Sequence, residues 1–264
     1  MPSPADKMIA RKEGAIGWII FNNPEKHNSV SLDMWQAVPD ILDEFEADPD
    51  ILSIVLTGAG EKAFVAGADI SQFEQARSNP ESVQNYEDTS TVAFERIASS
   101  SRPTIAMIDG YCIGGGLGIA LACDLRFAAK GSTFGIPAGK LGLAYPLVST
   151  KRLVDVVGPS SAKEIFFTAR RFDHDEALQM GLINRVLDKG ELETFTRATC
   201  EQIDDNAPLT VRNEKKIIDE LVREADSFDA KACLRLIAEC FGSDDYAEGR
   251  AAFMEKRKPA FKGK

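Results

Sequence analysis

Residues 102–137 read R-P-T-I-A-M-I-D-G-Y-C-I-G-G-G-L-G-I-A-L-A-C-D-L-R-F-A-A-K-G-S-T-F-G-I-P, and this stretch decides the fold. The apolar run Thr104–Ile108 predicts a short buried strand that ends at Asp109-Gly110. Glycines then crowd into one turn, and Ile119–Cys123 is apolar on every side, which predicts a buried helix. A second buried strand is expected at the end of the stretch.

The glycine turn has more than one interpretation. Gly114, Gly115 and Gly116 expose bare backbone, and a helix that begins there aims unpaired N–H groups and the positive end of its dipole at one spot. That arrangement suits an oxyanion, and tight packing alone is the alternative. Nucleotide binding is disfavoured, because a P-loop ends in Gly-Lys-Ser/Thr and a dinucleotide fingerprint begun at Gly114 meets Ile119 where it needs a small residue.

The composition combines enough apolar residues for a core with an excess of acid. The 264 residues are 44% hydrophobic and carry a formal net charge of −10. No apolar run is long enough to span a membrane, and residues 1–11 lack the apolar segment of a signal peptide. Five cysteines form no C-x-x-C pair and only two histidines occur, so no metal site is expected. These features predict a cytoplasmic protein without a membrane span that binds no nucleic acid.

Strand and helix patterns alternate over residues 1–190, whereas only helix patterns follow over residues 191–264. The first part predicts an α/β core, and the second predicts a helical C-terminal region. Gly158-Pro159 is expected to separate two helices. The polar stretch Asn79–Thr89 is expected to be irregular and to precede a helix at Ser90–Ser100. The strands expected before the glycine turn are Lys7–Arg11, Ile16–Phe21 and Ile51–Leu56.

Four segments along the chain carry motifs that can be compared with known families. The loop Asn23–Asn28 reads N-P-E-K-H-N, and Ala63–Ile70 reads A-F-V-A-G-A-D-I. Gly110–Gly116 reads G-Y-C-I-G-G-G and is followed by Cys123-Asp124, and Glu248–Arg257 reads E-G-R-A-A-F-M-E-K-R. In this order the four segments resemble the enoyl-CoA hydratase/isomerase family, the crotonase superfamily. Together they span nearly the whole chain, which is far more specific than any one motif.

The resemblance implies an α/β fold of the crotonase (ClpP-like) type, a spiral of β-β-α turns whose C-terminal helices assemble a homotrimer or a hexamer. It implies acyl-CoA thioester substrates and no separate cofactor, because CoA is part of the substrate. Carried over by position, the backbone N–H groups of Ala68 and Gly115 would hold the thioester oxygen. They are 47 residues apart, so only the folded core can bring them together. The substrate contacts that the resemblance implies are Lys26, Ala66, Gly67, Asp69, Ile70 and Gly114, with Phe253 and Lys256 reaching the nucleotide from a neighbouring subunit.

The sequence departs from the family at two positions that would supply acid and base. Hydration of an enoyl thioester uses two carboxyl groups beside Cα and Cβ. By resemblance they lie two residues after the triple glycine and just after the proline of the F-G-x-P segment, where this chain has Gly118 and Ala138. Neither side chain transfers a proton, so weak or absent hydration is expected. Glu74, Glu87 and Glu95 could bring a carboxylate from another direction, and the sequence does not rank them.

Two other functions stay open. Leu141–Val148 places Tyr145 in an L-G-x-x-Y-x-L-V context that resembles the methylmalonyl-CoA decarboxylase branch, although that branch has a histidine where this chain has Ala68. Decarboxylation needs an enolate-stabilising pocket and a proton donor but no carboxylate pair. Tyr145 could therefore orient a carboxylate or donate a proton, or it could be a packing residue. The remaining possibility is a protein that binds acyl-CoA without catalysis.

Overall fold

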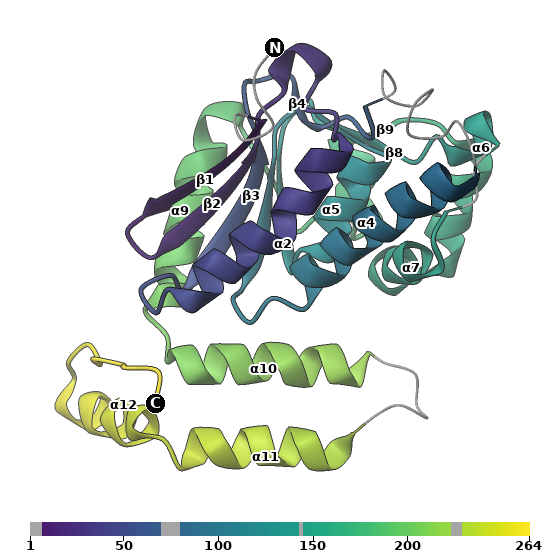
Figure 1. The fold of residues 1–264 in the computed structure, drawn as a ribbon. Coiled ribbons are helices and arrows are strands. Elements are labelled where there is room, and N and C mark those ends of the chain that lie inside the picture. The colour runs from purple at the N-terminus through teal and green to yellow at the C-terminus, as the bar shows by residue number, and fades with distance from the viewer. Residues whose placement is uncertain (1–6, 70–79, 143–144, 223–228) are drawn as a thin grey trace.

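The computed structural model describes residues 7–69, 80–142, 145–222 and 229–264, and two sheets form its core (Figure 1). The larger sheet has six strands in the order β1-β2-β3-β5-β7-β10, parallel throughout except that β1 runs antiparallel to β2. The bounds of these strands are β1 (Met8–Glu13), β2 (Ile16–Phe21), β3 (Ser53–Gly58), β5 (Thr104–Ile108), β7 (Leu125–Ala129) and β10 (Arg185–Leu187).

The smaller sheet has four strands in the order β4-β6-β8-β9, and only β9 pairs in the antiparallel direction. Its strands are β4 (Ala63–Val65), β6 (Tyr111–Ile113), β8 (Thr133–Gly135) and β9 (Phe172–Asp173). The helices that follow successive strand pairs are α4 (Pro80–Ala98), α5 (Gly115–Ala122) and α6 (Ala138–Leu141), and α7 (Leu147–Thr168) comes after α6. The chain therefore gives one strand to each sheet and then a helix, as in β3-β4-α4 and β5-β6-α5. This confirms the predicted α/β spiral of β-β-α turns.

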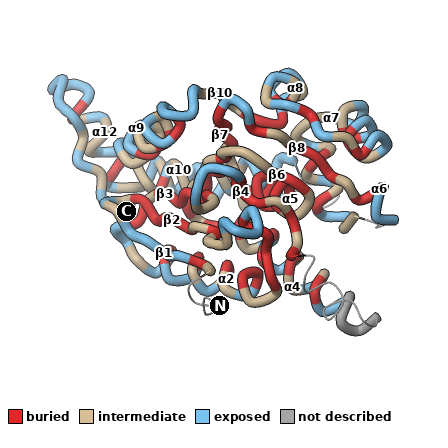
Figure 2. The backbone as a smooth tube through the Cα atoms, turned by 90° about the horizontal axis from the view of Figure 1, so that it is seen from above, coloured by how far each residue is buried: buried red, intermediate tan, exposed pale blue. Residues whose placement is uncertain are grey.

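Helices cover both faces of the larger sheet. The front face in Figure 1 carries α2 (Leu32–Ala47), and α9 (Leu192–Asp204) lies against the other face. Side chains of β2 alternate accordingly, because successive residues of a strand point to opposite faces. Ile19 belongs to the cluster under α2, whereas Trp18 packs with Leu192 at the start of α9. Figure 2 shows the result, with buried backbone concentrated along the strands.

Helix α4 corrects one sequence-based expectation. Residues predicted to be irregular as far as Thr89 are helical from Pro80 onward, and Asn79 itself lies outside the described residues. The polar residues of this stretch lie on the outer face of an amphipathic helix, where Gln84 donates a hydrogen bond to Asp88. Tyr86 is buried on the inner face. The prediction was wrong because one large apolar residue per turn is enough to anchor a helix, and local polarity hides such a face.

The break predicted at Gly158-Pro159 is present within α7. Gly158 has φ 75° and ψ 165°, a conformation outside the helical region, and Pro159 follows it. Glycine adopts a positive φ without the steric penalty of a side chain, so the chain changes direction here at low cost. The remaining short elements of the core are η1 (Pro24–Lys26), α8 (His174–Gln179) and η3 (Lys189–Glu191).

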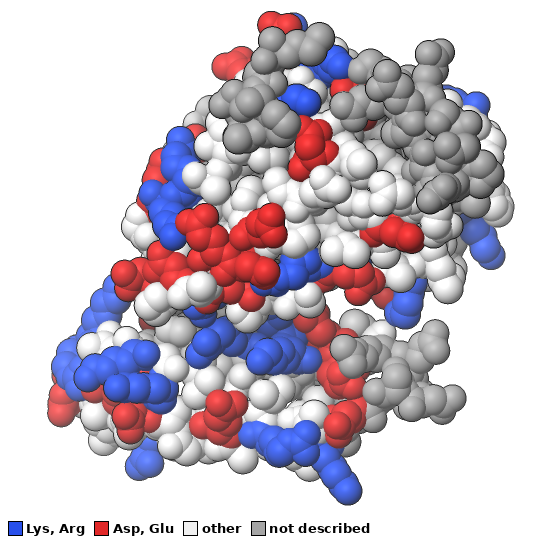
Figure 3. Space-filling model, in the orientation of Figure 1, with Lys and Arg blue, Asp and Glu red and all other residues white. Residues whose placement is uncertain are grey.

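The C-terminal helices α10 (Pro208–Leu221), α11 (Ala230–Phe241) and α12 (Asp244–Glu255) form a separate layer below the core in Figure 1. Figure 3 shows basic and acidic side chains interspersed over this layer. A partly buried ion pair joins it to the core, because Lys215 Nζ on α10 lies 2.8 Å from Asp124 Oδ2. The division between a core of residues 1–190 and a helical region of residues 191–264 stays a prediction, and α9 packs on the core sheet.

Candidate active site

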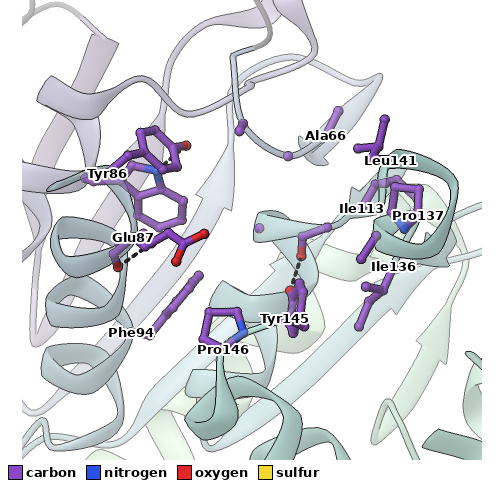
Figure 4. Close-up of a pocket in the computed structure, with 17 residues that line it drawn as sticks. Ala66, Tyr86, Glu87, Phe94, Ile113, Ile136, Pro137, Leu141, Tyr145 and Pro146 are labelled. Atoms are coloured by element: carbon purple, nitrogen blue, oxygen red, sulfur yellow. Dashed lines mark hydrogen bonds between the residues drawn. The ribbon is translucent and has the colours of Figure 1, made fainter. Parts of the chain in front are cut away.

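A cavity of about 180 Å³ lies between α4, the N-terminus of α5 and the segment around α6 (Figure 4). The two small-residue segments singled out in the sequence both reach it, at residues 66–68 and 114–115. Its walls are mostly apolar, and polar side chains enter at only a few points. The apolar lining includes Trp35, Phe94, Ile113, Ile136, Pro137 and Leu141, and the polar lining consists of Tyr86, Glu87, Ser90 and Tyr145.

The segment Ala66–Ala68 lines the cavity and leaves two backbone N–H groups, those of Gly67 and Ala68, without an acceptor among the described residues. The N–H of Ala66 donates to His27 O at 3.0 Å, and the N–H of Asp69 donates to Val30 O at 3.0 Å. Between these two anchors, the Ala68 N–H has no hydrogen-bond acceptor among the described residues. Gly67 supports this geometry with φ 107°, a backbone conformation that side chains strongly disfavour.

The first turn of α5 supplies the second donor. The Gly114 N–H donates to Gly135 O at 2.8 Å, and the Gly118 N–H donates to Gly114 O at 3.0 Å. The Gly115 N–H, at the first position of the helix, has no acceptor in the described part of the chain. A Cβ built on Gly115 would lie 4.0 Å from Gly67 Cα, so the two segments are in contact. The fold thus brings together two backbone regions that the sequence separates by 47 residues.

Trp35 forms the wall of the cavity behind Gly115. A Cβ added at Gly115 would lie 3.3 Å from Trp35 Cζ2, closer than most side-chain contacts, so the ring occupies the place of a side chain. The indole N–H of Trp35 donates to Tyr86 Oη at 2.8 Å, and its ring meets Phe94 edge-on at 5.0 Å between centroids. These contacts fix the ring, which keeps the backbone of the glycine turn bare.

Gly116 has a packing role instead of a chemical one. A Cβ at this position would lie 2.0 Å from Val65 O, which no rearrangement of a side chain could relieve. The middle of the triple glycine therefore serves the cavity, and its last residue allows α5 to approach β4. The tight-packing interpretation of the glycine turn therefore applies to Gly116, and an oxyanion site at Gly115 stays a prediction.

Tyr145 lies at the cavity with its hydroxyl group turned toward the glycine turn. Its O–H donates to Gly114 O at 3.0 Å, and its ring meets Phe166 edge-on at 5.5 Å between centroids. Burial raises the pKa of Tyr145 well above its ordinary value of 10.0, because a phenolate is poorly solvated there. The side chain is thus a neutral phenol that acts here as a hydrogen-bond donor.

The two positions where family resemblance expects glutamate are closed by apolar groups. A Cβ at Gly118 would lie 2.8 Å from Phe94 Cζ and 3.4 Å from Tyr145 Oη. The space for a longer side chain is therefore already filled. Ala138 lines the cavity and is 6% exposed, so a methyl group faces the site at the second position.

Other residues implied by resemblance lie away from the cavity lining. Lys26 Nζ forms an ion pair with Asp69 Oδ2 at 2.9 Å, and the carboxylate of Asp69 is nearly buried. Phe253, which is 83% exposed, lies on α12 in the C-terminal layer, and Lys256 follows that helix. Ile70 lies outside the described residues. Within this chain the structure therefore brings Ala66, Gly67, Ala68, Gly114, Gly115 and Tyr145 together at one cavity.

Sequence reasoning did not place helix α4 at the site. Glu87, Ser90 and Phe94 all line the cavity, and their spacing of three and four residues puts them on one face of a helix. The sequence predicts the helix only from Ser90 onward, which separates Glu87 from Ser90 and Phe94, so the shared face was missed. Of the three unranked glutamates, Glu95 is exposed, and its Oε1 lies 3.7 Å from Nη2 of Arg152. Glu74 lies outside the described residues.

Two other features are absent from the described residues, a metal-ligating cluster and a membrane-spanning helix. No group of three or more His, Cys, Asp or Glu side chains there could hold a metal ion. The same residues contain no helix long and apolar enough to cross a membrane.

Comparison with known proteins identifies the family of this chain. The family model for enoyl-CoA hydratase/isomerase matches residues 11–264. The chain belongs to the enoyl-CoA hydratase/isomerase family. Among relatives of this family, the short-chain-enoyl-CoA hydratase of Clostridium acetobutylicum is 34% identical over 257 residues, which is 96% of each chain. The crotonyl-CoA hydratase of Syntrophomonas wolfei is 33% identical over 260 residues, covering 97% of this chain and 98% of that protein.

Solved structures of the enoyl-CoA hydratase/isomerase family share the fold closely. An enoyl-CoA hydratase/carnithine racemase from Magnetospirillum magneticum superposes with a TM-score of 0.94 at 35% identity, covering 98% of this chain and 96% of that one. An enoyl-CoA hydratase from Bacillus anthracis gives a TM-score of 0.92 at 30% identity, with 98% and 100% covered. The family resemblance stated from the motifs is thus confirmed for the whole chain.

Proposed function

We propose that this protein is an acyl-CoA enzyme that stabilises the enolate of a thioester in the cavity. The observation that carries the proposal is the convergence of the Ala68 and Gly115 N–H groups, neither with a backbone acceptor among the described residues, in one apolar cavity. An enolate carries negative charge on the thioester oxygen. Preorganised donors in a dry site stabilise that charge, and removing one typically costs on the order of 3 kcal/mol of transition-state stabilisation. No separate cofactor is required, because CoA enters with the substrate.

The names of the relatives support a lyase that acts on short enoyl-CoA esters, whereas the side chains at the site argue against the ordinary hydratase mechanism. Gly118 and Ala138 provide no carboxyl group, and Phe94 fills the space beside Gly118. We therefore expect purified protein to hydrate crotonyl-CoA slowly. A turnover number at or above about 10² s⁻¹, well within the ordinary enzyme range, would overturn this expectation.

A second candidate function is decarboxylation of a malonyl-type CoA ester. The observation that favours it is Tyr145, whose hydroxyl group reaches the cavity beside Gly114. In this reaction the electron pair of the Cα–carboxylate bond forms the enolate and CO₂ leaves, so no side-chain base is needed. Incubation with methylmalonyl-CoA should then release CO₂, and Tyr145→Phe should slow it. A protein that binds CoA esters but turns over neither ester would be a non-catalytic binder.

We further propose a homotrimer or hexamer built through the C-terminal layer. Large apolar side chains on and beside α10 to α12 are exposed in the single chain, namely Ile218, Leu221, Val222, Leu234, Phe241, Phe253 and Met254. Exposed apolar patches of this kind mark interaction sites. In such an assembly Phe253 and Lys256 would lie against the nucleotide of a neighbouring subunit, with Lys26 near its phosphates. Light scattering on the purified protein measures the assembly, and a monomer would contradict it. Cytoplasmic location stays a prediction.

A further inference from the structure

Helix α4 carries a carboxylate into the cavity from a direction that the missing glutamates do not use. Figure 4 shows the Glu87 side chain turned away from the helix, toward the side of the cavity that carries Tyr145. Glu87 shares this face of α4 with Ser90 and Phe94, the ring of which occupies the space beside Gly118. The same helix therefore closes one carboxylate position and offers a carboxylate of its own.

The other polar side chains at the cavity have their hydrogens engaged elsewhere. Ser90 Oγ donates to the backbone carbonyl of Glu87 at 3.0 Å, and Tyr86 Oη donates to Val30 O at 3.3 Å. Tyr145 donates to the Gly114 carbonyl. The Glu87 carboxylate forms no ion pair or hydrogen bond with any side chain that the structure describes. Of the described lining residues, it is the one acid–base group left for a ligand.

We propose that Glu87 is the catalytic base and acid that moves the proton at Cα of the bound acyl-CoA. This assignment rests on the proposed function, because it needs the thioester oxygen at the Ala68 and Gly115 N–H groups. The Glu87 carboxylate takes a proton from Cα. The electron pair of that C–H bond forms the C1–Cα double bond, and the carbonyl π electrons move to the thioester oxygen. The protonated Glu87 returns the proton to Cα in the reverse step, so atoms and charge balance.

The chemistry of the site fits a single carboxylate in this role. The cavity walls are apolar, and charge that develops in such surroundings is stabilised mainly by the fixed N–H donors. One carboxyl group supports exchange or migration of a proton at Cα. Rapid hydration by the mechanism of the family hydratases needs a second carboxyl group to position water. A site with one carboxylate is therefore expected to hydrate enoyl-CoA slowly.

The test is hydrogen–deuterium exchange at Cα of butyryl-CoA in D₂O, followed by mass spectrometry, together with calorimetry of butyryl-CoA binding. Wild-type protein should bind and exchange. Glu87→Gln keeps size and removes the base, so exchange should fall by about 10² or more with binding retained. Glu87→Asp should recover part of the rate.

The matched control is Glu95→Gln, which removes an exposed carboxylate from the same helix and should exchange as wild type does. Binding with undiminished exchange in Glu87→Gln overturns the assignment to Glu87 and leaves the proposed function standing. Binding without exchange in wild-type protein also overturns it. Absence of butyryl-CoA binding to the wild-type protein overturns both the assignment to Glu87 and the proposed function. Thermal melts of each variant show whether a lost rate reflects lost folding.

Discussion

The hydroxyl group of Tyr145 donates a hydrogen bond of 3.0 Å to the carbonyl oxygen of Gly114, and that carbonyl shares a peptide group with the N–H of Gly115. The same carbonyl also accepts from the Gly118 N–H at 3.0 Å. Two donors on the oxygen fix the plane of the peptide and polarise it, which strengthens the N–H at its other end. Tyr145 can thus support an oxyanion without touching it.

Replacing Tyr145 with Phe should weaken catalysis while keeping the fold. The variant retains the ring packed on Phe166 and loses one hydrogen bond, which is worth about 1 kcal/mol. We expect kcat for enolate formation to fall by about fivefold, with a smaller change in KM. Tyr246→Phe, which changes an exposed ring in the C-terminal layer, is the control. Equal activity of the two variants would show that Tyr145 only packs.

Restoring a glutamate at position 118 should not restore hydration. The side chain of Gly118→Glu would collide with Phe94, so we expect a lower melting temperature and no gain in crotonyl-CoA turnover. Adding Phe94→Ala removes the obstructing ring and should recover part of the lost stability. If the single variant is as stable as wild type, the space beside Gly118 is not closed as described.

The last glycine of the turn should tolerate no side chain. Gly116→Ala places a methyl group against Val65 O, where backbone must shift, and should destabilise the protein by about 3 kcal/mol. Gly190→Ala is the matched control, because a Cβ there meets no atom within 4 Å. Urea unfolding of both variants measures the difference. Similar midpoints would contradict the close approach of α5 and β4.

The partly buried carboxylate of Asp204, which lies outside the cavity, should give the protein a measurable dependence of stability on pH. Burial raises the pKa of Asp204 from 3.8 to about 6, against a smaller opposing effect of Ser53. The folded chain therefore holds this proton more tightly than the unfolded chain, and stability falls as pH rises between those two values. Asp204→Asn removes the titration, so it should raise the melting temperature at pH 7.5 more than at pH 5. An equal effect at both pH values would contradict the raised pKa.

Much of the fold was predictable because its signals are local. The strand at Thr104–Ile108 and the buried helix after the glycine turn were predicted from apolar runs. The spiral was predicted from four motifs that occur in the same order as in the enoyl-CoA hydratase/isomerase family. The start of α4 was missed because its anchoring residues are sparse among polar ones. The ion pair between Lys215 and Asp124 joins residues that are 91 positions apart, and no local pattern indicates it.

The candidate site was predictable only in part for the same reason. Ala68 and Gly115 could be paired through resemblance, since two separate motifs had to occur together. Trp35 read as one apolar position on a helix, and only the folded chain shows it against Gly115. The sequence offered Glu87 as one of three unranked glutamates. Only the folded chain, in which α4 lies at the cavity, shows that Glu87 lines it.

A crystal structure with a bound acyl-CoA thioester tests the central claim most directly. The account predicts that the thioester oxygen lies within about 3.2 Å of both the Ala68 N and the Gly115 N, the reach of a hydrogen bond, with Cα facing Glu87. A thioester bound elsewhere, or an oxygen that contacts neither N–H group, would contradict it.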